Sequence, residues 1–188
     1  MLNYVKLKSI LIKVCSFYGT INVIVESEVY MSIEKVKKYF ANYGVEDRVV
    51  ELQESSATVE DAAKAIGCVE AEIAKTLSFN VYDEAILIVL AGDTKIENNK
   101  YRDCFNTKAR MLEHDEVEPL IGHPIGGVCP FAVKENVKVY LDESLKRFEY
   151  VYPACGSSHS AIKLTIPELE KYSNYTSWVD VGVKCDEK

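Results

Sequence analysis

Apolar residues recur along this chain at two spacings, one typical of helices and the other of strands. Residues 32–43 show the helical spacing, because Ile33, Val36 and Phe40 fall on one face and Gly44 follows as an end signal. The same reasoning, with polar caps before the apolar runs, predicts helical segments at residues 32–43, 58–66, 70–74, 97–104, 113–121 and 167–172.

The strongest strand signal is a hairpin. Residues 76–82 and 85–91 are joined by a tight turn at Asp83-Glu84, and the second run is apolar throughout, which predicts a central strand buried on both faces. Further strands are predicted at residues 49–52, 137–141, 148–152 and 161–165. Because helices and strands are mixed in order, with no repeat or linker, the pattern predicts one α+β (irregular α/β) domain around a mostly buried sheet.

The segment before the first predicted helix does not fit this pattern. Its apolar runs are interrupted by lysines, Ser16 and Asn22, so we expect neither a membrane helix nor a signal peptide. Met31 opens the strongly helical segment in the manner of a protein start. Two interpretations of residues 1–30 stay open: an appendage to a single domain at 31–188, or an extra strand or hairpin packed on that domain.

Composition narrows the classes of function. The 188 residues are 48% hydrophobic, which indicates a globular domain, and 29 acidic against 22 basic residues give a net charge of −7. A protein that binds nucleic acid by non-specific phosphate neutralisation is usually basic. If RNA is the substrate, its contact with this chain should be brief, confined to one end, or helped by a partner.

The six cysteines are scattered, without a Cys-x-x-Cys motif or a histidine at metal-site spacing. We therefore expect reduced thiols in a cytoplasmic protein, with no disulfide framework, no metal and no cofactor.

The glycine-rich stretch 122–130 is the first candidate for chemistry. Gly126 and Gly127 permit positive φ and a close approach of ligand to backbone. Such a loop can turn N–H groups toward a carbonyl oxygen or oxyanion, and Pro130 fixes where regular structure resumes. Composition alone favours the simpler interpretation of a turn between two elements.

Lys75 lies where a predicted helical turn meets a buried strand. A lysine is seldom buried without a partner, so it either extends to solvent or faces a cleft. In a cleft it could bind a phosphate or carboxylate as a point charge. Taken alone, the residue fits the solvent-exposed interpretation better.

The loop 152–160 offers Cys155, Ser157, Ser158 and His159, which suggests a nucleophile and base. Neighbours in one loop rarely form such a pair, because a third group must orient the base. A hydrolase that uses Cys155 or Cys129 as nucleophile, with His123 or His159 as base, stays open as an alternative. His114 is expected to be merely solvated.

Four short segments occur in a characteristic order: Ala74–Phe79, Ala91–Asp93, Gly122–Pro130 and Pro153–Gly156. Together they resemble the YbaK/ProX family of freestanding aminoacyl-tRNA deacylases, relatives of the editing domain inserted in bacterial prolyl-tRNA synthetases. The likeness runs from about residue 32 to residue 181, and residues 1–30 have no counterpart in it. It implies the YbaK fold, a curved mixed sheet surrounded by helices.

The resemblance also implies roles for individual residues. Lys75 matches the family's essential lysine, which holds the 3′-terminal nucleotide of the tRNA. The segment Gly126–Pro130 matches the G-x-x-x-P loop, whose backbone positions the ester carbonyl, so Gly126 and Gly127 join Lys75 as catalytic candidates. The substrate-binding candidates are Val128, Cys129, Pro130, His123, Ala154, Cys155, Gly156 and Ser157.

The implied function is a trans-editing hydrolase that deacylates mischarged tRNA, of the tRNA-Pro type and carrying a small wrong amino acid. Its partners would be the 3′ end of aminoacyl-tRNA and a prolyl-tRNA synthetase, with no membrane. Where the cysteinyl-tRNA-specific branch has Ser and Asp, this chain has Ala154 and Ala161. The resemblance therefore does not identify which amino acid is removed. The alternative is a non-catalytic module of the same fold that binds tRNA or a synthetase.

Overall fold

The computed structural model describes residues 32–52 and 58–185. Residues 32–41 form a helix, and the later helices are α3 (Val59–Ile66), α4 (Asn98–Phe105), α5 (His114–Ile121) and α6 (Ile166–Ser173). The strands are β1 (Val49–Glu51), β2 (Ile73–Val81), β3 (Glu84–Ala91), β4 (Thr94–Ile96), β5 (Lys138–Asp142), β6 (Tyr150–Pro153), β7 (Ser160–Ile162), β8 (Leu164–Thr165), β9 (Ser177–Val179) and β10 (Gly182–Lys184). Short 3₁₀ turns occupy Glu46–Arg48, Glu70–Glu72 and Glu143–Arg147.

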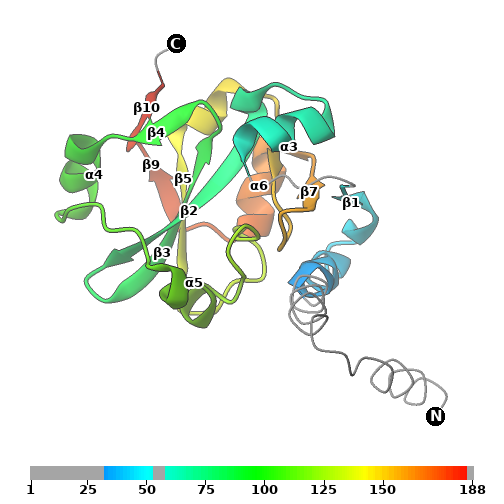
Figure 1. Cartoon of the computed structure of the whole chain (residues 1–188), viewed down its shortest axis with the longest axis horizontal. Coiled ribbons are helices and arrows are strands. Elements are labelled where there is room, and N and C mark those ends of the chain that lie inside the picture. The colour runs from blue at the N-terminus through cyan, green and yellow to red at the C-terminus, as the bar shows by residue number, and fades with distance from the viewer. Residues whose placement is uncertain (1–31, 53–57, 186–188) are drawn as a thin grey trace, which may run out of the picture.

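A mixed six-stranded sheet in the order β8-β6-β2-β3-β5-β9 forms the centre of the molecule. The hairpin β2–β3 is antiparallel, whereas β6, β5 and β9 join through parallel pairs. Two small sheets, β1–β7 and β4–β10, flank it. In Figure 1 the hairpin crosses the middle of the molecule, with α4 on one side and β1 and β7 on the other. The predicted α+β class and the curved mixed sheet are confirmed.

Strand β3 is buried along almost its whole length, as its apolar sequence predicts. Its side chains alternate between two cores, as the period of a strand requires. Leu87 and Val89 pack in the larger core with the helix 32–41, α5 and α6. Ile86 and Ile88 pack in the smaller one, with α4 and the β9–β10 segment. Burial on both faces makes this strand the centre of the fold.

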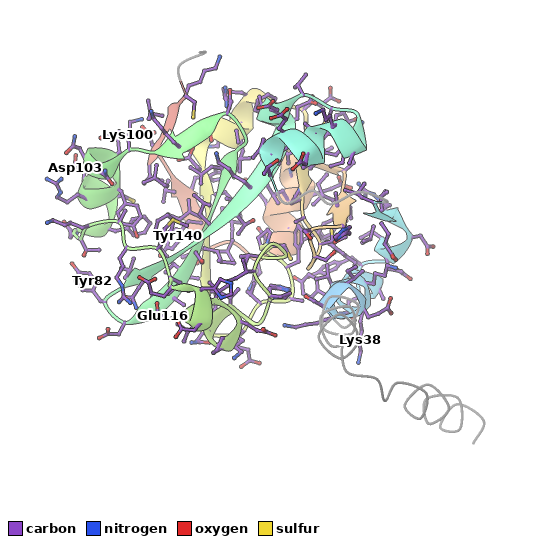
Figure 2. All side chains as sticks on the ribbon, viewed as in Figure 1. Lys38, Tyr82, Lys100, Asp103, Glu116 and Tyr140 are labelled. Atoms are coloured by element: carbon purple, nitrogen blue, oxygen red, sulfur yellow. The ribbon has the colours of Figure 1, made fainter. Side chains whose placement is uncertain are left out.

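The hairpin turn lies one residue earlier than the sequence suggested. Tyr82 and Asp83, not Asp83 and Glu84, form it, and both have positive φ (50° and 66°). A two-residue turn with positive φ at both positions matches the right-handed twist of the strands. This match outweighs the cost of placing residues other than glycine there. The Tyr82 side chain is 69% exposed at the tip of this hairpin (Figure 2).

Two predicted segments differ in type or extent. Residues 70–74 are not wholly helical, because the turn Glu70–Glu72 gives way to β2 at Ile73, where pairing with β6 and β3 overrides local propensity. Residues 161–165 are two strands rather than one, since β7 pairs with β1 and β8 pairs with β6. Strands β4, β9 and β10 have no counterpart in the sequence prediction.

The helix ends follow their predicted signals. Thr58 caps α3 by accepting a hydrogen bond from the Asp61 N–H, and Gly67 ends the helix with φ +78°. Gly44, with φ +67°, follows the helix 32–41. The two interpretations of residues 1–30 concern a segment outside the described residues. In the described part of the chain, no helix is long and apolar enough to cross a membrane.

Candidate functional site

The predicted site segments meet at a mainly apolar cavity of about 520 Å³. Its walls come from α3, β2, the start of α5, the glycine-rich loop, and strands β6 and β7 with the residues between them. Lys75, Gly126, Val128 and Ala154 all line it. Larger surface hollows of about 840 and 590 Å³ contain none of the predicted site residues. We therefore place the candidate site in the smaller cavity.

Lys75 is held inside β2, where it pairs with Leu90 of β3. Its ammonium donates a hydrogen bond to the Gly92 carbonyl at 3.0 Å. Burial lowers the pKa of Lys75, and the nearby Cys185 and Asp93 offset part of that effect. Among the described residues its ammonium makes no ion pair with a carboxylate, so a positive charge remains inside the cavity for a ligand to neutralise.

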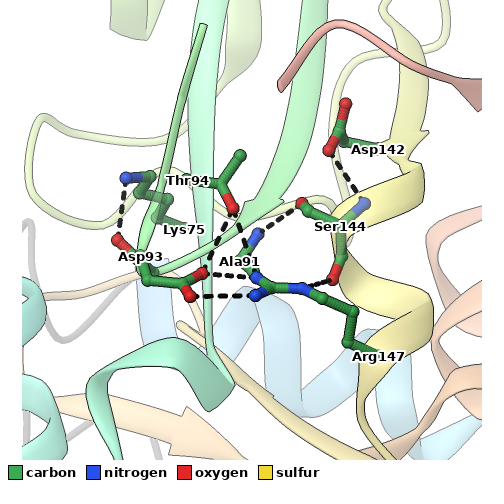
Figure 3. A network of polar contacts seen from close by, with 8 residues as sticks. Lys75, Ala91, Asp93, Thr94, Asp142, Ser144 and Arg147 are labelled. Carbon is green, nitrogen blue, oxygen red and sulfur yellow. Dashed lines mark hydrogen bonds and ion pairs between the residues drawn. The ribbon is translucent and has the colours of Figure 1, made fainter. Parts of the chain in front are cut away.

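The turn that carries the Gly92 carbonyl is fixed from behind by a polar network (Figure 3). Both terminal guanidinium nitrogens of Arg147 donate to the Asp93 carboxylate, Nη1 at 2.9 Å, and this contact lowers the pKa of Asp93. The Ala91 N–H donates to the Ser144 hydroxyl at 3.2 Å. Gly92 itself has no room for a side chain, since a Cβ would lie 1.9 Å from the Glu70 carbonyl oxygen.

Sequence reasoning missed Ser144 and Arg147, which lie 53 and 54 residues after the Ala91 and Asp93 that they contact. The one signal was that segment itself, an apolar strand that ends in Gly-Asp.

The glycine-rich loop and the 153–160 loop meet backbone to backbone. A Cβ on Gly127 would lie 2.3 Å from the Gly156 carbonyl oxygen, so only glycine permits this approach. The Gly127 N–H closes a turn onto the Pro124 carbonyl at 3.0 Å, with Gly126 at φ +81°. The N–H groups of Gly126 and Val128 find no hydrogen-bond acceptor among the described residues.

The structure differs from the expectation that the side chains of three residues bind substrate: His123, Cys129 and Cys155. All three are fully buried and none lines the cavity, because the loop turns them toward the core. The His123 Nε2 donates to the Phe131 carbonyl at 2.7 Å, and Nδ1 accepts from the Ser32 hydroxyl at 3.2 Å. Burial lowers the pKa of His123 to about 4, so the ring is neutral near pH 7. These side chains hold the loop from behind.

The two loop thiols are poor nucleophiles. Burial raises the pKa of Cys129 to about 12 and that of Cys155 well above its usual value, so neither is a thiolate near neutral pH. Ser158 and His159 do contact each other, with Oγ 3.1 Å from Nδ1.

The remaining predicted residues are also buried and do not line the cavity: Gly127, Pro130, Gly156 and Ser157. Ser157 contacts the Ser160 hydroxyl at 3.0 Å and accepts from the His159 N–H, which shapes the second loop. A Cβ on Gly156 would lie 2.7 Å from the Ser32 carbonyl oxygen, so that loop also packs closely on the first described helix.

Other cavity residues were not predicted. His114, expected to be merely solvated, is exposed but lines the cavity at the start of α5. Tyr152 lines it from β6. Ala161, which forms a bridge to the predicted residue Ala154, also contributes to the wall. Sequence periodicity placed Tyr152 and Ala161 in strands but gave no sign of which face meets a ligand.

No group of three or more His, Cys, Asp or Glu side chains in the described ranges is placed to hold a metal ion. The five cysteines described are free thiols.

Comparison with known proteins gives one consistent result. The sequence model of the "Aminoacyl-tRNA editing domain" matches residues 53–172. Uncharacterized protein YwhH of Bacillus subtilis (strain 168) is 52% identical over 80% of this chain and 97% of its own length. The proline–tRNA ligase of Aquifex aeolicus (strain VF5) is 31% identical over 47% of this chain, which is 16% of that ligase.

A solved structure described as a proposed trans-editing enzyme for prolyl-tRNA synthetase shares the fold. It superposes with a TM-score of 0.73 at 28% identity, and the match covers 81% of this chain and 97% of that one.

Proposed function

Because this chain belongs to the aminoacyl-tRNA editing domain family, we propose that it is a trans-editing hydrolase that cleaves the ester between a wrong amino acid and tRNA. One observation carries the proposal: Lys75 and the glycine-rich loop, far apart in sequence, line the same cavity. A fixed cation and exposed backbone donors are what an ester substrate with a nearby phosphate requires.

In this proposal each residue has a defined task. The Lys75 ammonium binds the terminal nucleotide as a compact charge. The N–H groups of Gly126 and Val128 donate to the ester carbonyl, and more strongly to the oxyanion that forms when water attacks. Loss of one such donor typically costs about 3 kcal/mol of transition-state stabilisation. The aminoacyl ester is already activated, so no protein nucleophile is needed.

We propose, as the resemblance to the family implies, that the amino acid removed is small and that the apolar part of the cavity wall receives its side chain. Ala154 and Ala161 present only methyl groups, and Val128 and Ile125 add apolar surface. We propose tRNA-Pro as the carrier, since the relatives include prolyl-tRNA ligases and a proposed trans-editing enzyme for prolyl-tRNA synthetase. A prolyl-tRNA synthetase would be the partner, and the cytoplasm the compartment, because charged tRNA is made and used there.

The test is a deacylation assay with tRNA-Pro charged in turn with alanine, serine, cysteine and proline. We expect catalytic turnover of at least one small wrong amino acid and slow hydrolysis of prolyl-tRNA-Pro. Lys75→Ala is the matched control for contaminating activity. Binding of these tRNAs without turnover would instead support the non-catalytic module.

A further inference from the structure

A second lysine lies beside the candidate site, on the strands that form one wall. The Lys163 ammonium lies over the Tyr150 ring, 4.1 Å from its centroid, and 6.0 Å from the centroid of Tyr152. Tyr152 itself lines the cavity. These three residues, which we call the Lys163 clamp, therefore continue the cavity wall outward with one cation and two aromatic rings.

The position of Lys163 is fixed although its side chain is exposed. It occupies the single residue between β7 and β8, and the Arg48 guanidinium donates to its carbonyl at 2.6 Å. Arg48 is in turn paired with Glu168, so those two charges balance each other. The Lys163 ammonium has no carboxylate partner in the part of the chain that the structure describes, and cation–π contact alone leaves its charge uncompensated.

Strand register relates the clamp to Lys75. Tyr152 is the parallel partner of Ile73, and Lys75 lies two residues beyond Ile73 on the same face. Tyr150 lies two residues before Tyr152, again on that face. At about 3.3 Å per residue, Tyr150 and Lys75 are separated by about 13 Å along the strand direction. Extended single-stranded RNA covers such a span in about two nucleotides.

We propose that the Lys163 clamp binds the phosphate backbone of the single-stranded 3′ end of tRNA, one or two nucleotides before the terminal nucleotide that Lys75 receives. This inference rests on the proposed function. Lysine supplies the charge for a phosphate, and the tyrosine rings hold the ammonium in place and present an aromatic surface toward the adjacent bases. One ordered cation also fits a chain of net charge −7, whose RNA contact has to be local.

The test compares two substrates that share the ester but not the upstream phosphates: alanyl-tRNA-Pro and the alanyl ester of adenosine. For Lys163→Ala we expect a roughly tenfold lower kcat/KM on the tRNA, through KM, and unchanged hydrolysis of the adenosine ester. Loss of one single-strand phosphate contact should also make the plot of log kcat/KM against log salt shallower by about 0.7. Lys163→Arg and Tyr150→Phe should stay close to wild type.

Lys171→Ala is the matched control, because the Lys171 ammonium also lies over two tyrosine rings, at 5.5 Å from Tyr43 and Tyr172, but away from the cavity. This variant should behave as wild type on both substrates. The inference is overturned if Lys163→Ala matches Lys171→Ala, or if it slows both substrates equally.

If the wild-type protein hydrolyses neither substrate, the proposed function fails, and the clamp is judged by binding alone. A fluorescent single-stranded RNA that ends in CCA should then bind Lys163→Ala more weakly than Lys171→Ala. Equal binding by the two variants would refute the clamp as well.

Discussion

Lys75 combines burial with an uncompensated charge. Burial lowers the pKa of the ammonium, and the nearby Cys185 and Asp93, neither of which forms an ion pair with it, offset only part of that effect. A ligand phosphate would supply the missing negative charge. At the scale of a single residue, this imbalance is the clearest physical indication of a binding site.

We expect Lys75→Ala to lower kcat/KM for mischarged tRNA by at least about 100-fold, because removal of a hydrogen-bonded interior charge costs about 3 kcal/mol or more. Lys75→Arg should also be poor, since a planar fork does not replace a compact ammonium. Thermal unfolding should show that both variants remain folded. Wild-type turnover by the Ala variant would remove Lys75 from the site.

Cys129→Ala and Cys155→Ala should each retain measurable turnover, with an altered amino-acid preference as the expected side effect. Both thiols are fully buried and their pKa values are raised, so neither supplies a thiolate. Rapid quenching and mass spectrometry should detect no acyl-enzyme. A trapped thioester, or complete loss of activity in a well-folded variant, would favour covalent catalysis.

At the scale of elements, the two site loops depend on each other through backbone contact. Gly127→Ala should therefore destabilise the protein by more than about 2 kcal/mol and abolish deacylation, because its methyl group meets the Gly156 carbonyl. Gly126→Ala meets nothing closer than 3.6 Å and should cost only about 1 kcal/mol, from its positive φ. Denaturant unfolding would rank the two variants, and the reverse order would refute the packing argument.

The N-terminus of α6 joins two elements through charge. Thr165 and Glu168 form a capping box, and Arg48 pairs with Glu168, which lowers the pKa of that carboxyl to about 2 from an ordinary 4.5. A lowered carboxyl pKa contributes stability above about pH 4.5, and this stability is lost as the pH falls toward 2.

Glu168→Gln should therefore lower the free energy of unfolding by about 1 kcal/mol at pH 7. This difference between wild type and variant should become smaller below pH 4.5. Chemical denaturation across this pH range measures the difference. Glu60→Gln, which removes an exposed pair with Lys64, should change stability by less than about 0.5 kcal/mol. A constant difference between wild type and Glu168→Gln at every pH would contradict the assignment.

Elements with strong local signals could be predicted from the sequence. Helix α3 begins after Thr58 and ends before Gly67, as expected, and the apolar run of β3 identified the central strand. Strands β9 and β10 could not be predicted, because each is three residues long and pairs with a strand distant in sequence.

The sequence could predict which segments of the chain form the site, but not the directions of all their side chains. The likeness to a family identified the segments around Lys75 and Gly126, both of which line the cavity. The direction of the Cys129 and His123 side chains depends on how the loop packs against the core, and no spacing rule encodes that.

For the whole molecule, a chain of residues 31–188 should be folded and active. It retains Ser32, which contacts His123 and packs against Gly156, and it includes the entire family match at 53–172. We expect its unfolding midpoint and kcat/KM to lie close to those of the full chain. An insoluble or inactive product would show that residues 1–30 belong to the domain.

Strand β3 is closed to solvent from Ala85 to Ala91 and paired along both edges, with β2 and with β5. Amide hydrogens in such a strand exchange with deuterium only when the whole domain opens, whereas those of a short peripheral pair such as β1–β7 exchange through local opening. Lys75 is paired directly with this strand. The cation proposed to receive the tRNA end is thus paired with the strand whose amide hydrogens we expect to exchange most slowly. Local opening of the cavity should occur mainly at its β7 wall.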